Sequence, residues 1–130
     1  MKAYWDSSAL VESTIDLPLR LRLKTERGFS RAHTLAECFS ALTAGSLSVR
    51  LNADDAAKVV EQLAGDLDFV TLTPHDMLQA MKRAKKLGVR GGRIHDLMHA
   101  VAASKSGAQE MLTTDQNDFN GLTQLTISQV

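Results

Sequence analysis

Short apolar runs alternate along the chain with longer segments in which apolar residues recur at helical spacing. We predict strands from the short runs, at residues 3–5, 31–34, 69–72, 111–113 and 122–127. The longer segments between these runs are predicted helices. This alternation is typical of an α/β domain, and it predicts a mostly parallel sheet of about four to five strands flanked by helices on both faces.

Capping residues mark several of the predicted helix starts. Ser7 and Ser8 are expected to cap a helix that follows the first strand, and Asn52 is expected to cap another that ends before Gly65. The sequence Thr-Pro-His-Asp at 73–76 matches a capping box with proline at the first helical position. Local chemistry therefore predicts three helix starts.

Other predicted helices rest on periodicity. Residues 16–27 contain alternating leucines, but Pro18 near the start of this segment favours a helix, and we interpret it as one. A helix over 34–42 and another over about 94–105 each show one apolar face. In the helix that follows the capping box, the residues expected to be buried are Met77, Leu78, Met81 and Ala84.

Composition and charge are those of an ordinary globular chain. The sequence has 130 residues, 44% of them apolar, and its 15 Lys and Arg balance 15 Asp and Glu. This length predicts a single domain over residues 1–130 that can bury a core without a disulfide or a structural metal. Cys38 is the only cysteine, and no window approaches 18 consecutive apolar residues, so we expect a cytoplasmic protein without a membrane-spanning segment.

Four acidic residues stand where an α/β domain binds its ligands, at the carboxyl ends of parallel strands. Asp6 and Asp115 directly follow predicted strands. Glu37 lies in the first turn of the helix after the second strand, and Asp96 opens the helix over 94–105. Each acid alone is more often a turn or helix cap. Together, carboxylates would raise one another's pKa unless a cation lay among them, and hard ions such as Mg²⁺ or Mn²⁺ take such oxygen ligands.

The segments that carry these acids resemble the motifs of a known family. WDSSALVE, HTLAEC, GRIHDLMHAVAA and LTTDQNDF occur in this order and resemble the four acidic motifs of the PIN domain family. They are closest to those of the toxin ribonucleases of bacterial VapBC-type toxin–antitoxin pairs. The resemblance covers the whole chain and implies an acidic site of Asp6, Glu37, Asp96 and Asp115, with Asp118 as an auxiliary acid.

The resemblance also implies a chemistry and a set of partners. The acids would hold Mg²⁺ or Mn²⁺ against an RNA phosphodiester, which a metal-activated water would hydrolyse, with Glu37 as a ligand or a water-orienting group. Ser8 and Thr113 match polar positions that orient the carboxylates. Toxins of this type are bound by a cognate antitoxin protein and commonly form homodimers, so we expect both partners in addition to RNA.

A basic segment precedes the helix that carries Asp96. Six of the fifteen positive charges fall within residues 82–93, which contain no acid: Lys82, Arg83, Lys85, Lys86, Arg90 and Arg93. The ordinary interpretation is a solvated helix face. Because the segment leads directly to an expected metal ligand, we interpret it as a guide for the RNA phosphate backbone.

Four other interpretations stay open at the level of sequence. One is that the chain is a catalytically silent PIN-like module that only binds RNA or protein. Another is that the run at 95–99, which imitates the helix of zinc proteases, is a zinc-binding helix. Cys38 beside Glu37 suggests a thiol nucleophile, although its place on an apolar face favours an inert buried thiol. Asp6 followed by two serines suggests a phosphoaspartate site, which gives Glu37 and Asp115 no role.

Overall fold

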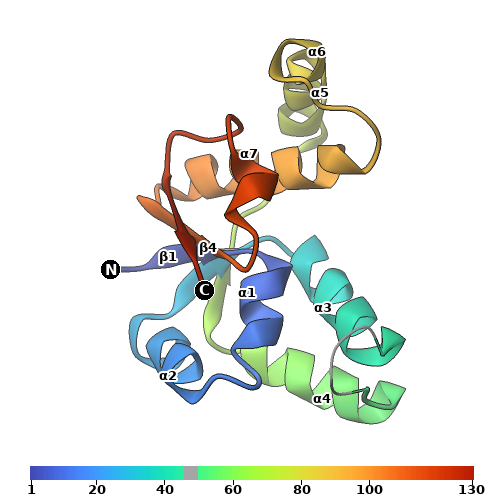
Figure 1. Ribbon diagram of the computed structural model, residues 1–130, viewed down its shortest axis with the longest axis vertical. Helices are drawn as coiled ribbons and strands as arrows, with labels where there is room; N and C mark the ends of the chain where they lie inside the picture. Colours follow the sequence, from blue (N-terminus) through green and yellow to red (C-terminus); the bar gives the residue numbers. More distant parts are fainter. Residues whose placement is uncertain (46–49) are drawn as a thin grey trace.

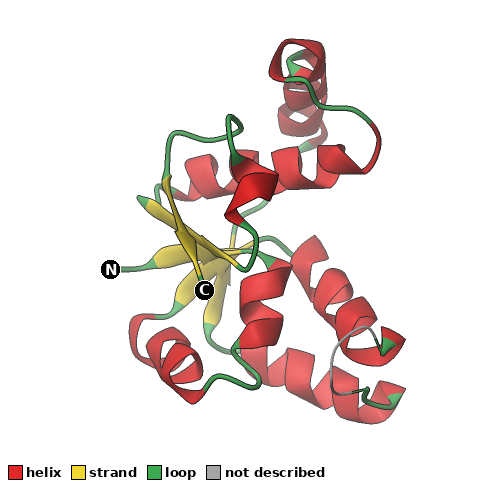
Figure 2. Ribbon diagram, in the orientation of Figure 1, coloured by secondary structure: helices red, strands yellow, loops and turns green. Residues whose placement is uncertain are grey.

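Five short strands form one sheet in the computed structural model, which describes residues 1–45 and 50–130 (Figure 1, Figure 2). The sheet order is β3-β2-β1-β4-β5, and each pairing between neighbours is parallel. The strands are β1 (Ala3–Trp5), β2 (Gly28–Ser30), β3 (Leu67–Phe69), β4 (Glu110–Thr113) and β5 (Thr126–Gln129). The predicted α/β fold is confirmed, and the carboxyl ends of the strands lie along one edge.

Helices lie on both sides of the sheet (Figure 1). One side carries α1 (Ser7–Glu12), α2 (Leu17–Glu26), α3 (His33–Ala44) and α4 (Ala53–Ala64). The other side carries α5 (Pro74–Lys82), α6 (Ala84–Leu87) and α7 (Ile94–Ser106). Two short 3-10 helices are η1 (Gly91–Arg93), before α7, and η2 (Gln116–Phe119), after β4. None of the helices described is both long and apolar enough to cross a membrane.

The central strand β1 divides the core by the two-residue period of a strand. Ala3 and Trp5 pack into a cluster with residues of α1 to α4, whereas Tyr4 packs on the opposite side with residues of α7 and η2. All three side chains are buried. A short polar-aromatic run makes a central strand here because both of its faces are covered.

β1 and β4 lie within one residue of their predicted positions, but β2 does not. It covers Gly28–Ser30 rather than 31–34. Gly28 approaches β1 so closely that a Cβ there would lie 2.6 Å from Cδ1 of Trp5, which only glycine avoids. This approach sets the pairing, and α3 begins at His33, within the predicted strand.

The two outer strands are also shifted from their predicted positions. β3 covers Leu67–Phe69 rather than 69–72, and β5 covers Thr126–Gln129 rather than 122–127. In each case register with the neighbouring strand selects the paired residues, since Leu67 lies opposite Gly28 and Thr126 lies opposite Glu110. The apolar content of a segment alone does not predict which of its residues pair with the neighbouring strand.

Capping chemistry sets several helix starts as predicted. Oδ1 of Asn52 accepts the backbone N–H of Asp55 at 2.8 Å at the start of α4. Thr73 and Asp76 form the reciprocal capping box at the start of α5. Asp16 caps α2, which confirms that the leucine-rich segment after it is helical.

α5 buries less of its apolar stripe than its periodicity predicts. Ala80 is buried and Met77 is half-buried, but Leu78 and Met81 are 57% and 45% exposed. The helix packs on α7 and lies beyond it, away from the sheet, at the top of Figure 1. The apolar face of α5 therefore packs against one helix rather than against the sheet. The prediction that Leu78 and Met81 are buried is wrong.

Candidate active site

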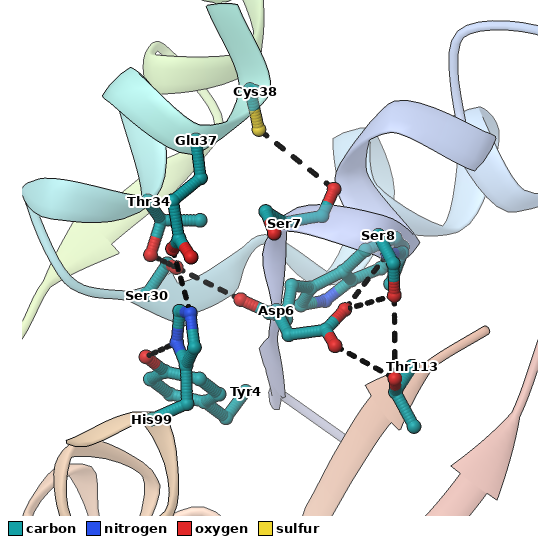
Figure 3. A network of polar contacts seen from close by, with 12 residues as sticks. Tyr4, Asp6, Ser7, Ser8, Ser30, Thr34, Glu37, Cys38, His99 and Thr113 are labelled. Atoms are coloured by element: carbon teal, nitrogen blue, oxygen red, sulfur yellow. Dashed lines mark hydrogen bonds and ion pairs between the residues drawn. The ribbon is translucent and has the colours of Figure 1, made fainter. Parts of the chain in front are cut away.

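Asp6 lies at the carboxyl end of β1, where three hydrogen bonds hold its carboxylate (Figure 3). Oδ1 accepts from Ser8 Oγ at 2.7 Å and from the backbone N–H of Ala9 at 2.8 Å, and Oδ2 accepts from Thr113 Oγ1 at 2.7 Å. The residue is only 6% exposed. Asp6 is therefore the N-cap of α1, in place of the predicted Ser7 or Ser8, because its side chain reaches the free N–H of the first turn.

Three further carboxylates come from two other elements. Asp96 lies in the first turn of α7, Asp115 caps η2, and Asp118 lies within η2. Burial raises the pKa of Asp96, and the charges of Asp118 and Asp6 raise it further. Burial also raises the pKa of Asp118, followed by the charges of Asp115 and Asp6. Asp6, Asp96, Asp115 and Asp118 thus form one electrostatic group, called here the carboxyl-edge cluster.

No cation pairs directly with the carboxyl-edge cluster. Across residues 1–45 and 50–130, none of its four carboxylates has a Lys, Arg or His nitrogen within 4.0 Å. Arg93 donates from Nη2 to the backbone carbonyl of Asp118 at 3.3 Å. Its charge opposes the burial that raises the pKa of Asp96 and Asp118, without reversing either shift. The nearby charge of Arg93 therefore offsets the negative charge of the cluster only in part.

Glu37 has a different environment, because it is hydrogen-bonded to His99 (Figure 3). Nε2 of His99 lies 2.7 Å from Oε1 of Glu37, and Nδ1 of His99 lies 2.7 Å from the hydroxyl of Tyr4. The ionised carboxylate of Glu37 can only accept, so Nε2 of His99 carries a hydrogen and donates to it. In the neutral ring Nδ1 is then the acceptor, and the hydroxyl of Tyr4, whose pKa is raised by burial, donates to it.

This hydrogen bond holds Glu37 in its ionised form. Burial acts to raise the pKa of Glu37, but the hydrogen bond from His99, together with the charge of Arg31, brings the pKa below its ordinary value. The contact between His99 and Glu37 does not follow from the sequence motifs. The signal that could have found it is a histidine among the small buried residues of α7, where a polar group needs a partner.

The carboxyl-edge cluster fits a divalent cation in its chemistry. All of its donors are carboxylate oxygens, the ligands that Mg²⁺ and Mn²⁺ prefer. Burial, and after it the neighbouring carboxylates, raise the pKa of Asp96 and Asp118, so a cation beside them would favour their ionised forms. In the part of the chain that the structure describes, no three His, Cys, Asp or Glu side chains already converge on one ion position. Asp6 is buried and held by three hydrogen bonds, whereas Asp115 and Asp118 are exposed, and Oδ1 of Asp115 accepts the backbone N–H of Asn117.

The geometry supports neither the zinc-helix interpretation nor the thiol interpretation. Both ring nitrogens of His99 are already hydrogen-bonded, and the ring of His95 stacks on His33 with the ring centroids 6.0 Å apart. Cys38 is buried, its Sγ lies 3.8 Å from the Ser7 carbonyl oxygen, and burial raises the pKa of the thiol to about 12. The prediction that Cys38 is buried is confirmed, and the raised pKa disfavours the thiolate that a nucleophile requires.

The predicted RNA-binding segment falls into two parts. Four of its residues are exposed on α5, on α6 or, for Arg83, at the junction between them, and these helices lie beyond α7 and away from the sheet (Figure 1): Lys82, Arg83, Lys85 and Lys86. Arg90 is exposed just before η1. Arg93 is the member of the segment that contacts the carboxyl-edge cluster, through the backbone of Asp118. Only the end of the basic segment reaches the acids.

Comparison with known proteins identifies the family and the fold of the chain. The sequence matches the PIN domain family over residues 3–123, and the chain belongs to that family. Its members are in general nucleases that use divalent metal ions. The crystal structure of PAE2754 from Pyrobaculum aerophilum is similar, with a TM-score of 0.72 and 17% identity over 98% of this chain and 89% of that chain, which shows a shared fold. No curated protein matches the sequence.

Proposed function

We propose that this protein is a metal-dependent endoribonuclease that hydrolyses RNA phosphodiester bonds with a water activated by Mg²⁺ or Mn²⁺. The observation that carries the proposal is the carboxyl-edge cluster, four carboxylates without a cationic partner at the edge where parallel sheets bind ligands. Such a cluster repels the RNA backbone until cations neutralise it. Membership of a nuclease family supports the same activity.

Asp6 would be the fixed ligand of the ion. A carboxylate offers about four lone-pair sites, and the contacts with Ser8, Ala9 and Thr113 use three of them, which leaves one site on Oδ2. Asp96, with Asp115 and Asp118 from η2, would supply the other protein ligands. When bound, the ion lowers the pKa of a bound water and stabilises charge on the phosphoryl oxygens.

Glu37 would orient the attacking water and accept its proton, while His99 positions Glu37. The hydrogen bond from Nε2 of His99 fixes one carboxylate oxygen and leaves the other available. The lowered pKa keeps the group ionised, as a proton acceptor requires. Of the two roles that the sequence allows for Glu37, this environment favours water orientation over direct ligation.

The test is cleavage of an end-labelled single-stranded RNA by the full chain in Mg²⁺, in Mn²⁺ and in EDTA. We expect Asp6→Asn and Asp96→Asn each to slow cleavage on the order of a hundredfold or more, and EDTA to stop it until excess metal is added. Asp54→Asn is the matched control, because Asp54 is an exposed acid in the first turn of α4. Chelator-resistant cleavage, or an Asp6→Asn variant as active as Asp54→Asn, would contradict the proposal.

The biological role that the four motifs support is that of the toxin in a toxin–antitoxin pair. The partners would be a cognate antitoxin protein and a second copy of this chain in a homodimer. Expression in a bacterial host is expected to arrest growth, and Asp6→Asn, but not Asp54→Asn, is expected to relieve the arrest. Light scattering measures the oligomeric state. Normal growth of cells that express the wild type would contradict the toxin role without contradicting ribonuclease activity in vitro.

A catalytically silent PIN-fold module that binds RNA or protein is the second candidate function. It is favoured by the lack of a converged ion position among the described residues. Such a module would bind the test RNA without cutting it in any metal, and Mn²⁺ would not change its Tm. Metal-dependent cleavage by the wild type that Asp6→Asn abolishes excludes this candidate.

A further inference from the structure

A cavity of about 160 Å³ lies beside the candidate active site. Its lining includes Arg31, His33, Met77, Met81, His95 and Met98. His33 also lines the adjoining hollow that contains Glu37, and His95 immediately precedes Asp96 in α7. The cavity therefore adjoins the acids although none of them belongs to its wall, and the proposed hydrolysis gives it no role.

Arg31 stands in the wall of this cavity as a buried cation that makes no direct ion pair among the described residues, although its charge helps to lower the pKa of Glu37. The residue is 9% exposed, and its Nε is fully buried and makes no hydrogen bond among the described residues. Within residues 1–45 and 50–130, no carboxylate lies within 4.0 Å of its guanidinium. Buried guanidinium groups are normally paired, because an unpaired charge is costly to remove from water. A ligand that brings a hydrogen-bond acceptor would meet this need.

The other walls of the cavity are apolar or aromatic. Met77, Met81 and Met98 supply thioether surface. The rings of His33 and His95 lie nearly parallel, with 16° between their planes. Methionine adapts to flat aromatic ligands and makes favourable sulfur contacts with them, whereas a bare phosphate would place strongly hydrated oxygens against these apolar walls. The lining thus favours a flat ring with acceptors along one edge.

The volume suits the insertion of one flat ring. A closed cavity of about 150 Å³ holds one benzene molecule, so about 160 Å³ takes a ring of one base. Because His33, Met81 and His95 in the lining are exposed, the cavity opens to solvent, where the rest of the nucleotide would lie. We propose that this cavity is a nucleobase subsite that takes a guanine from single-stranded RNA, with the guanidinium of Arg31 donating to O6 and N7. The inference rests on the proposed function, since the base belongs to RNA that lies across the carboxyl-edge cluster. It makes cleavage depend on the identity of a nucleotide beside the scissile bond.

Binding without metal tests the subsite separately from catalysis. The full chain in EDTA is titrated with the monophosphates of guanosine, adenosine, cytidine and uridine, and with ribose 5-phosphate, which carries the phosphate but no base. The imidazole resonances of His33 and His95 are followed by NMR. We expect guanosine monophosphate to shift both and to bind roughly tenfold tighter than ribose 5-phosphate. Equal binding of ribose 5-phosphate, or no shift of either histidine at millimolar ligand, would overturn the subsite.

Two variants on α5 provide a matched pair for the same titration. Met81→Glu places a carboxylate at the cavity where it competes for Arg31, and Leu78→Glu makes the same change on an exposed residue outside the lining. We expect Met81→Glu to weaken guanosine monophosphate binding roughly tenfold and Leu78→Glu to leave it unchanged. Both positions are exposed, so neither variant disturbs the core. Equal effects of the two variants would refute the proposal.

Arg31 itself is tested by Arg31→Lys and Arg31→Met, with thermal melts to show that each variant folds. Lysine keeps the charge but loses the planar fork, so both variants should lose the preference for guanine. In cleavage maps of a mixed-sequence RNA, we expect the wild type to cut beside guanosine and Met81→Glu to cut without that preference. Nucleotide binding without any metal-dependent cleavage would contradict the proposed function alone, whereas cleavage without base preference would contradict the subsite alone.

Discussion

The two edges of the parallel sheet treat their acidic residues in opposite ways. At the edge formed by the amino ends of the strands, four carboxylates each pair with at least one cation, and we call this set the amino-edge network. The pairs are Arg22 with Glu26 at 2.7 Å and with Glu110 at 2.6 Å, Arg20 with Asp66 at 2.7 Å, and Arg27 with Asp68 at 3.1 Å. At the opposite edge, the carboxyl-edge cluster has no such pair within the described chain.

The pKa shifts at the two edges have opposite signs. Hydrogen bonds from the N-terminal ammonium and Arg22 lower the pKa of Glu26, and hydrogen bonds from Lys2 and Arg27 lower that of Asp68. Burial and neighbouring carboxylates raise the pKa of Asp96 and Asp118. The difference therefore lies in the partners that the fold supplies. One edge uses its acids to join α2 to the strands. The other holds carboxylates that repel one another without a directly paired cation, and a bound cation would offset this repulsion.

The sharpest contrast is expected in RNA cleavage. Asp6→Asn should reduce the rate on the order of a hundredfold or more, because it removes the proposed fixed ligand, whereas Glu26→Gln in the amino-edge network should leave the rate unchanged. Single-turnover cleavage at saturating Mg²⁺ measures both. A similar loss in the two variants would mean that the edges do not differ in function.

The next largest effect is expected in thermal stability with metal. A ligand that binds only the native state at a hundred times its Kd adds about 2.7 kcal/mol to the free energy of unfolding, so millimolar Mn²⁺ should raise the Tm of the wild type. The double variant Asp96→Asn with Asp118→Asn should lose most of this rise, and Glu26→Gln should keep it. If the double variant responds to Mn²⁺ like the wild type, the ion binds elsewhere.

A smaller effect is expected from Arg22→Met. This change leaves Glu26 and Glu110 without Arg22, and partly exposed ion pairs contribute up to about 1 kcal/mol each, so the free energy of unfolding should fall by about 1–2 kcal/mol. Urea unfolding measures the loss, and RNA cleavage at a temperature where the variant is folded should match the wild type. Loss of cleavage in the folded variant would show that the amino-edge network affects the active site.

The smallest effect is expected in the pH dependence of stability without metal. The pKa of Asp118 is raised, so its stabilising contribution is full below the ordinary aspartate pKa of about 3.9 and is lost as pH rises through the raised value. The wild type should therefore lose stability as pH rises through this value, and Asp118→Asn should lose less. The difference in the free energy of unfolding should be below about 0.5 kcal/mol, because the carboxylate is exposed.

Glu26 provides the control with the opposite sign. Its pKa is lowered, so its contribution is present above the ordinary glutamate pKa of about 4.3 and is lost as pH falls through the lowered value. As pH falls, the free energy of unfolding should therefore decrease less in Glu26→Gln than in the wild type. Urea unfolding in EDTA across about pH 3 to 7 compares the two variants. Parallel pH profiles for Asp118→Asn and Glu26→Gln would contradict the opposite signs.

Features that depend on a few adjacent residues could be predicted from the sequence. The cap at Asn52, the capping box at Thr73 and the strand over 3–5 follow from local chemistry, and the structure contains all three. Four separate motifs suggest one acidic site, and the structure groups Asp6 with three of the expected acids at the carboxyl edge. The order of the motifs carries this information because the fold repeats strand and helix in the same order.

Features that depend on contacts between distant residues could not be predicted. His99 meets Tyr4 across 95 positions and Arg22 meets Glu110 across 88, and no local pattern marks either pair. The apolar stripe of α5 is present in the sequence, but its period does not say that the helix lies beyond α7 and leaves Leu78 exposed. The start of β2 depends on how closely Gly28 approaches Trp5, which only the packed sheet reveals.

The double use of Asp6 has an evolutionary consequence. Its carboxylate both caps α1 and belongs to the carboxyl-edge cluster, so a change to alanine would cost about 0.5–2 kcal/mol of stability in addition to activity. Asp118 is exposed and caps no helix, so a descendant could lose it without harm to the fold. A lineage that abandons cleavage is therefore expected to lose its η2 acid first and to keep Asp6, or an asparagine, as a relic of the ancestral site.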